Sequence, residues 1–137
     1  MNKKNKFILW FNELSIEDVP LVGGKNASLG EMYRNLTRKG VKVPNGFAVT
    51  TNAYDYFIEK AKIKDTIKKI LEGLDTKKIK NLEEKGRRVR ETILKGELPQ
   101  DLKEAIANAY KKLCKQYGAN TDVAVRSSAS AEDLPTA

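Results

Sequence analysis

The sequence contains no histidine and only one cysteine, Cys114, in 137 residues. Without histidine, this chain cannot supply histidine metal ligands, a Ser-His or Cys-His nucleophilic pair, or a phosphohistidine. A single cysteine excludes an internal disulfide framework and a cysteine cluster with metal-ligand spacing. The missing histidine limits the possible functions more than any motif that is present.

Long hydrophobic runs are also missing. No stretch approaches the roughly 18 apolar residues that a membrane span needs. Residues 1–6, which are polar except for Met1, lead into a short apolar run at residues 7–11. This run ends before Asn12 and is too brief for a signal peptide. We therefore expect no membrane segment and a cytoplasmic location. A hydrophobic content of 40% over this length suits one domain or part of a larger one.

The chain is basic, with 26 Lys and Arg against 18 Asp and Glu and a formal net charge of +8. Such a balance can indicate an anionic partner, either a nucleotide or a nucleic acid. However, the cations lie in segments with helical apolar periodicity and interleaved acids, which is typical of solvated helix faces. A basic nucleic-acid-binding module stays open as an alternative of another functional class, and steeply salt-dependent binding to duplex DNA would identify it.

Apolar periodicity predicts about five helices. The first follows a loop at residues 21–26 and ends near Gly40, and the second is capped by Thr51. Two more cover residues 63–71 and 79–93, where Gly86 falls on the apolar face and is a candidate for close helix contact. The last begins with Pro99 as its first helical residue and ends at Gly118.

Three short strands are predicted between these helices. Residues 7–11 and 47–50 have the aromatic and aliphatic composition of half-buried strands, and the second follows turn-forming residues at 44–46. Residues 122–126 alternate between polar and apolar, with Val123 and Val125 on one face. The resulting fold class is α+β, with mixed α/β layers.

Two glycines and a lysine form the first candidate site. Gly23 and Gly24 come directly before a helix, so they allow the backbone to approach a ligand where the helix presents its first N–H groups. Lys25 adds a mobile positive charge that suits phosphate oxygens. The spacing is not that of a Walker A loop, and an ordinary turn is the alternative interpretation of these residues.

Arg126 forms the second candidate site, at the end of the third predicted strand. Its guanidinium can bind phosphate through two parallel hydrogen bonds, and Ser127 and Ser128 add hydroxyl and N–H groups. The alternative is a surface arginine paired with Glu132 or Asp133. These two acids could also suggest magnesium ligands or a catalytic pair, but we interpret them as loop acids.

Three blocks of sequence resemble the phosphoenolpyruvate synthase and pyruvate phosphate dikinase family. The blocks are LVGGKNASLGEM at residues 21–32, GVKVPNGFAVTTNAY at residues 40–54 and VRSSASAEDLP at residues 125–135. They occur in the family's order and extend over nearly the whole chain. The form of the third block resembles the synthases more than the dikinases, and rifampin phosphotransferases share that form.

The resemblance implies the first subdomain of an ATP-grasp-like nucleotide-binding domain. It implies that Lys25 and Arg126 contact the phosphates of ATP, with Gly23, Gly24, Ser127 and Ser128 beside them. The complete enzyme would convert ATP, pyruvate and water into phosphoenolpyruvate, AMP and phosphate through a phosphohistidine, with Mg²⁺ neutralising the transferring groups.

Several family features are absent from this sequence, namely the loop over the triphosphate, the second subdomain with its Mg²⁺ ligands, the histidine domain and the pyruvate-binding barrel. We therefore expect residues 1–137 to be a partial ATP-binding domain, truncated at its C-terminus and inactive alone, that meets pyruvate only through other domains. Equivalent pieces of a rifampin phosphotransferase or a pyruvate phosphate dikinase remain alternatives. The sequence leaves the oligomeric state open.

Overall fold

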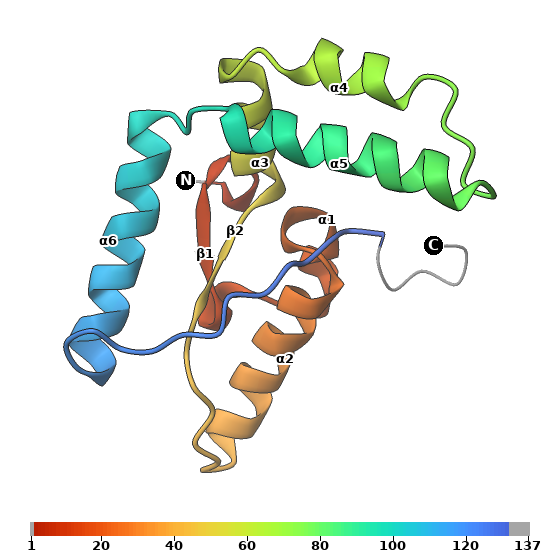
Figure 1. The fold of residues 1–137 in the computed structure, drawn as a ribbon. Coiled ribbons are helices and arrows are strands. Elements are labelled where there is room, and N and C mark those ends of the chain that lie inside the picture. Colours follow the sequence, from red (N-terminus) through yellow and green to blue (C-terminus); the bar gives the residue numbers. More distant parts are fainter. Residues whose placement is uncertain (1, 132–137) are drawn as a thin grey trace. The chain divides into compact units, whose positions relative to one another are not determined.

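The computed structural model describes residues 2–131 of the chain (Figure 1). The chain divides into two compact units, and each has its own packing. One unit contains Met1–Tyr54 together with the chain from Asp101 onward, and the other contains Asp55–Gln100.

A two-stranded antiparallel sheet lies in the first unit. Strand β1 (Ile8–Trp10) pairs with β2 (Phe47–Val49), so that Leu9 lies opposite Ala48 and Trp10 opposite Phe47. The rings of this second pair have centroids 5.4 Å apart in a tilted arrangement, which is favourable for cross-strand aromatic residues. Both strands were predicted from the sequence, and each is shorter than expected.

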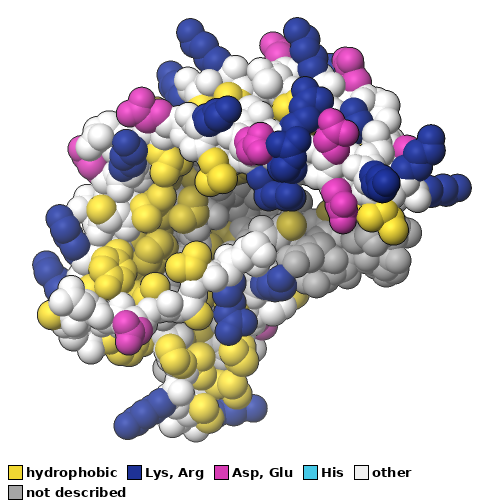
Figure 2. Space-filling model, viewed as in Figure 1, with side chains coloured by type: hydrophobic (Ala, Val, Ile, Leu, Met, Phe, Trp, Pro, Cys, Tyr) yellow, Lys and Arg dark blue, Asp and Glu magenta, His cyan; other side chains and the backbone are white. Residues whose placement is uncertain are grey.

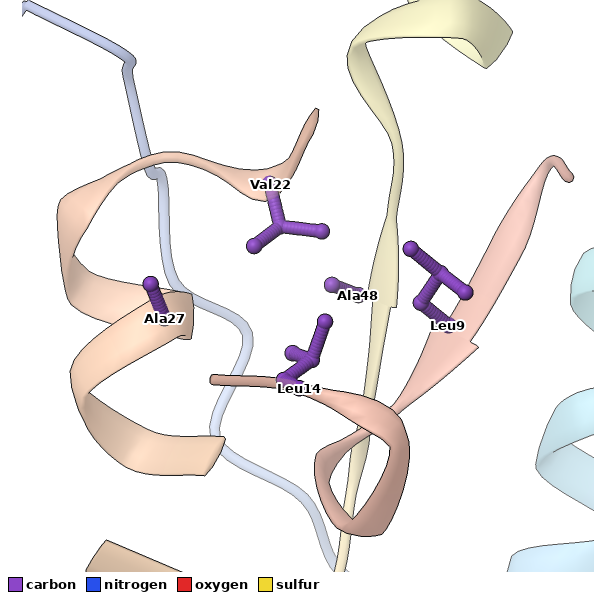
Figure 3. Close-up of a cluster of buried hydrophobic side chains, with 5 residues drawn as sticks. All are labelled: Leu9, Leu14, Val22, Ala27 and Ala48. Atoms are coloured by element: carbon purple, nitrogen blue, oxygen red, sulfur yellow. The ribbon is translucent and has the colours of Figure 1, made fainter. Parts of the chain in front are cut away.

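The core of this unit fills the space between the sheet and the helices that follow β1. The short helix α1 (Val19–Val22) and the long helix α2 (Gly24–Arg38) come after the 3-10 turns η2 (Phe11–Glu13) and η3 (Ile16–Asp18). Figure 3 shows the buried side chains that converge from these elements, which are Leu9, Leu14, Val22, Ala27 and Ala48. Their burial fixes α2 against the N-terminal segment.

Carboxylates close the two turns that lead into α1. Asp18 accepts hydrogen bonds from the backbone N–H of Ser15 and from the ammonium of Lys3 in the turn η1 (Lys3–Asn5), both at 2.9 Å. Glu13 accepts in the same way from Trp10 N–H and Lys6. Partial burial raises the pKa of each carboxyl, but these bonds and the lysine charges outweigh it and lower the pKa below its ordinary value. The ionised form therefore stabilises the fold.

Helix α3 (Thr51–Lys60) begins directly after β2. The prediction that Thr51 caps it was wrong, because the buried hydroxyl of Thr50 accepts the N–H of Ala53 at 3.2 Å and donates to Lys6 O at 2.6 Å. The hydroxyl of Thr51 instead donates to Pro20 O. Two adjacent threonines gave the sequence analysis no basis for choosing between them.

Helix α6 (Gln100–Tyr117) belongs to the first unit and agrees well with its prediction. Leu102, Ala109 and Leu113 are buried along one face, and Gly118 stops the helix with a φ of 117°. Pro99 precedes the helix instead of opening it. The five predicted helices are thus present as α2 to α6 in the described chain, with the four-residue α1 in addition.

The second unit is built around α4 (Lys64–Leu71) and α5 (Ile79–Lys95), which pack against each other. The ammonium of Lys85 donates to the carbonyls of Ile70 and Glu72 at the end of α4. Most other Lys and Arg side chains of these helices are exposed and lie among acidic ones (Figure 2). The prediction of solvated basic faces is confirmed for this unit.

The prediction that Gly86 marks a close helix contact was wrong. A Cβ placed there would meet only the flexible guanidinium of Arg90, at 3.2 Å. The prediction rested on the position of Gly86 in the apolar stripe of α5, but a place on that stripe does not by itself show how near the next helix lies.

The predicted third strand, residues 122–126, is absent from the described chain. A strand needs a neighbour for its N–H and C=O groups, but β1 and β2 pair with each other and not with these residues. Val123 and Val125 are 49% and 92% exposed. The C-terminal segment, residues 121–131, instead runs without regular structure past the start of α2 (Figure 1).

None of the helices within residues 2–131 combines the length and the apolar character that a membrane crossing requires.

Candidate anion-binding site at the start of helix α2

Gly23 separates α1 from α2. Its φ of 80° and ψ of 163° interrupt the helical path, and residues with a side chain rarely adopt this conformation. The N–H of Gly23 donates to Val19 O at 2.8 Å, and the side-chain amide of Asn26 donates to Val22 O at 3.0 Å. These two bonds satisfy carbonyl groups of α1 where that helix ends, and α2 begins at Gly24, the residue after Gly23. The residues predicted to form a loop before the helix are thus largely helical.

The start of α2 has the properties of an anion site. Its 15 residues align their peptide dipoles, so the first turn carries partial positive charge, and its first N–H groups have no acceptor within the helix itself. No acidic residue lies in that turn, and Gly23 has no side chain that could cap it. Lys25 is the second residue of the helix and is exposed, which places a full positive charge at the same end.

The C-terminal segment lies against this helix start. The N–H of Gly24 donates to Ala129 O at 3.3 Å, and the N–H of Asn26 is directed at the hydroxyl oxygen of Ser128 at 3.5 Å, the long end of the hydrogen-bonding range. A Cβ at Gly23 would collide with Ser128 Oγ and would lie 2.8 Å from Ala129 N. Chain segments about 100 residues apart are therefore in direct contact.

These contacts show where the backbones of the two predicted cations, Lys25 and Arg126, lie. Lys25 lies between Gly24 and Asn26, the two residues that donate to the C-terminal segment. Arg126 precedes Ser128 by two residues, and two residues of extended chain span at most about 7 Å. Arg126 and Ser127 are exposed, and the contacts just described do not involve their side chains.

The roles predicted for the glycines need one qualification. Gly23 and Gly24 contact Ser128 and Ala129, but both glycine N–H groups donate within the chain. An anion could use the N–H of Gly24 only by displacing Ala129 O. The side chains of Lys25 and Arg126 therefore remain the predicted ligands, and the glycines bring their segments together.

Two groups that build this site were not predicted from the sequence. Asn26 bonds Val22 O through its side chain, and the preference of asparagine for such local backbone bonds was a usable signal. Ala129 contributes only its carbonyl oxygen, and no residue preference marks a main-chain acceptor in a loop.

The described residues offer no evident metal centre. Within residues 2–131, no three His, Cys, Asp or Glu side chains group closely enough to hold an ion. Glu132 and Asp133, which sequence analysis interprets as loop acids, lie outside the described residues.

Comparison with known proteins gives the family context. Residues 19–137 match the family model described as the AMP/ATP-binding domain of pyruvate phosphate dikinase. The chain is 54% identical over 138 residues to a phosphoenolpyruvate synthase of Aquifex aeolicus, covering 100% of this chain and 16% of that protein. It is 50% identical to the synthase of Synechocystis sp. over 99% of this chain and 17% of the relative. It is 41% identical to the Escherichia coli synthase, again over 99% of this chain and 17% of the relative. The chain thus spans about a sixth of the length of the curated relatives that it matches.

Proposed function

Since the chain belongs to the AMP/ATP-binding domain family of pyruvate phosphate dikinase, we propose that it forms part of the ATP site of a phosphoenolpyruvate synthase. In this proposal, Lys25 and Arg126 bind the phosphates of ATP. The relatives named above are all phosphoenolpyruvate synthases, which favours this assignment over a rifampin phosphotransferase, a pyruvate phosphate dikinase or a nucleic-acid-binding module.

The contact of the C-terminal segment with the start of α2 is the observation that carries the proposal. It brings the chain around Arg126 to the chain around Lys25, although the two residues are far apart in sequence. A triphosphate carries several negative charges, and each charge-assisted hydrogen bond to it contributes roughly 1.5–3 kcal/mol. The helix dipole of α2 adds a smaller favourable term of about 0.3–1 kcal/mol.

The complete reaction is part of the same proposal. ATP, pyruvate and water would give phosphoenolpyruvate, AMP and phosphate through a phosphohistidine, with Mg²⁺ supplying charge neutralisation. This chain has no histidine, and residues 2–131 hold no acidic metal cluster. We therefore assign the phosphohistidine, the Mg²⁺ ligands and the pyruvate site to other parts of the synthase, outside the sixth of the relatives' length that this chain matches. A cytoplasmic location belongs to this proposal, because ATP and pyruvate are cytoplasmic metabolites.

Titration of the chain with MgATP, followed by calorimetry and by backbone amide NMR shifts, tests the phosphate contacts. We expect Lys25→Ala and Arg126→Ala each to weaken binding by about tenfold or more, since about 1.4 kcal/mol corresponds to tenfold. The matched control is Lys39→Ala, because Lys39 is exposed at the other end of α2 and should leave the affinity unchanged.

Two results would contradict the proposal. The first is an absence of amide shifts at residues 25 and 126 of the unmodified chain at millimolar MgATP. The second is an equal loss of affinity in the Lys39→Ala control, which would indicate only a general attraction between a basic protein and an anion.

A further inference from the structure

Ser128 occupies the place that an N-cap side chain normally takes. In most helices, the residue before the first turn accepts the N–H of its second or third helical residue through a side-chain oxygen. Gly23 stands at that position in α2 and has no side chain. The N–H of Asn26, the third residue of the helix, is directed instead at Ser128 Oγ at 3.5 Å. The helix is therefore capped by a residue about 100 positions later in the sequence.

The missing side chain at Gly23 is what allows this contact. A Cβ there would collide with Ser128 Oγ and would approach Ala129 N to 2.8 Å and the Ala129 carbonyl carbon to 3.0 Å. The side chain of Asn26 fixes the same turn from within, through its bond to Val22 O. Gly23 thus provides the space into which Ser128 and Ala129 fit.

The neighbouring serines do not share this environment. Ser128 is half-buried, whereas Ser127 and Ser130 on either side are exposed. The carbonyl of Ala129 accepts the N–H of Gly24 at 3.3 Å, so two consecutive residues hold the segment against the helix. Arg126 is only two residues before this attachment point, and its backbone freedom depends on it.

We propose that Ser128 is a positioning residue, whose hydroxyl caps α2 and thereby holds Arg126 beside Lys25 at the ATP phosphates. This inference rests on the proposed function. A ligand group that is held in place before binding loses less conformational entropy when it binds. Without the Ser128 contact, only the bond from Gly24 N–H to Ala129 O holds the segment, and Arg126 is held less firmly near Lys25.

The test is whether Ser128→Ala removes the contribution of Arg126 and spares that of Lys25. The affinity of the chain for MgATP is measured by calorimetry for Ser128→Ala alone and combined with Arg126→Ala or Lys25→Ala. We expect Ser128→Ala to weaken binding by several-fold, and Arg126→Ala to have less than about a twofold further effect in that background, because residues coupled through a shared backbone shift are non-additive. Lys25→Ala should weaken binding by the same factor with or without Ser128.

Matched variants separate the hydroxyl from general damage. Ser127→Ala changes an exposed serine in the same segment and should match the unmodified chain, while Ser128→Thr keeps the hydroxyl and should restore most of the affinity. The inference is overturned if Arg126→Ala costs the same factor in both backgrounds, or if Ser127→Ala and Ser128→Ala behave alike.

A ligand-free readout distinguishes this inference from the proposed function. Amide hydrogen exchange at Asn26 should accelerate in Ser128→Ala and stay unchanged in Ser127→Ala, because only the first loses the cap. Unchanged exchange in both variants would overturn the capping contact even if MgATP binds. A different outcome is accelerated exchange at Asn26 in Ser128→Ala while Lys25→Ala and Arg126→Ala bind MgATP as tightly as the unmodified chain. That outcome would refute the proposed phosphate site and leave the cap established. Gly23→Ala should accelerate exchange at Asn26 in the same way, which provides a second variant should Ser128→Ala not fold.

Discussion

Replacement of Gly30 by alanine tests how closely α2 must pack to hold Lys25 in place. A Cβ at Gly30 would collide with the Cβ of Leu14, which is fully buried, and would lie 3.1 Å from Phe11 O. Alanine in a helix interior gains about 0.8–1.0 kcal/mol over glycine, but overpacking of a tight core costs about 1–3 kcal/mol or more. Because backbone and core atoms stand in the way here, we expect the upper part of that range and a net loss of about 1–2 kcal/mol.

Gly86→Ala is the matched control, since Gly86 also lies inside a helix. Its Cβ would meet only the movable guanidinium of Arg90, so the gain in helix propensity should prevail and stabilise α5 by up to about 1 kcal/mol. Urea denaturation is followed by fluorescence of Trp10, the single tryptophan, for the first unit, and by hydrogen exchange along α5 for the second. Equal or greater stability of Gly30→Ala relative to the unmodified chain would refute the packing argument.

Two further predictions concern the first unit. Asp18→Asn should cost about 1 kcal/mol at neutral pH, in the range of about 0.5–2 kcal/mol for a lost cap, while its exposed neighbour Glu17→Gln should be neutral. Because the pKa of Asp18 is lowered in the folded chain, its stabilisation is present above the ordinary carboxyl pKa and is lost as the pH falls through it toward the folded value. Acid titration of stability should therefore be shallower in Asp18→Asn, and an identical acid profile would count against the Lys3 ion pair. Leu9→Ala removes a side chain that is 0% exposed and should cost about 2–5 kcal/mol, whereas Leu94→Ala, at 83% exposure, should change the free energy of unfolding by less than about 0.5 kcal/mol.

Local signals in the sequence predicted most of the fold. The ends of α2 and α6 were predictable because Gly40 and Gly118 adopt positive φ, a backbone state that glycine allows and most residues do not. Strands β1 and β2 were predictable because their short runs of aromatic and aliphatic residues suit a half-buried sheet. These features depend on a residue and its immediate neighbours.

Features that depend on distant partners were missed or misassigned. The alternation around Val123 and Val125 is that of a strand, but residues 122–126 pair with neither β1 nor β2, although both strands keep an outer edge. The segment runs instead to the start of α2, where Ser128 and Ala129 are bound. Likewise, Thr50 and Thr51 are equally good caps in sequence, and burial beside Lys6 O selected the first. The position of Gly86 in an apolar stripe carried no information about its distance from the neighbouring helix.

The candidate site shows the same division. Gly23, Gly24 and Ser128 were named from the sequence, and the structure brings all three into contact. The mode of contact was not predictable, because Ser128 caps a helix that begins about 100 residues earlier. The phosphate ligands Lys25 and Arg126 remain predictions, which MgATP titration will test.

The long separation between Asn26 and Ser128 also bears on the order of events during synthesis. A ribosome adds about 5–20 residues per second, so roughly 5–20 s pass between the emergence of these two residues. During that interval water alone can satisfy the first N–H groups of α2 that the C-terminal segment later covers. The proposed ATP ligands Lys25 and Arg126 are separated by a similar length of chain, so both become available to the phosphates only after residue 126 has emerged.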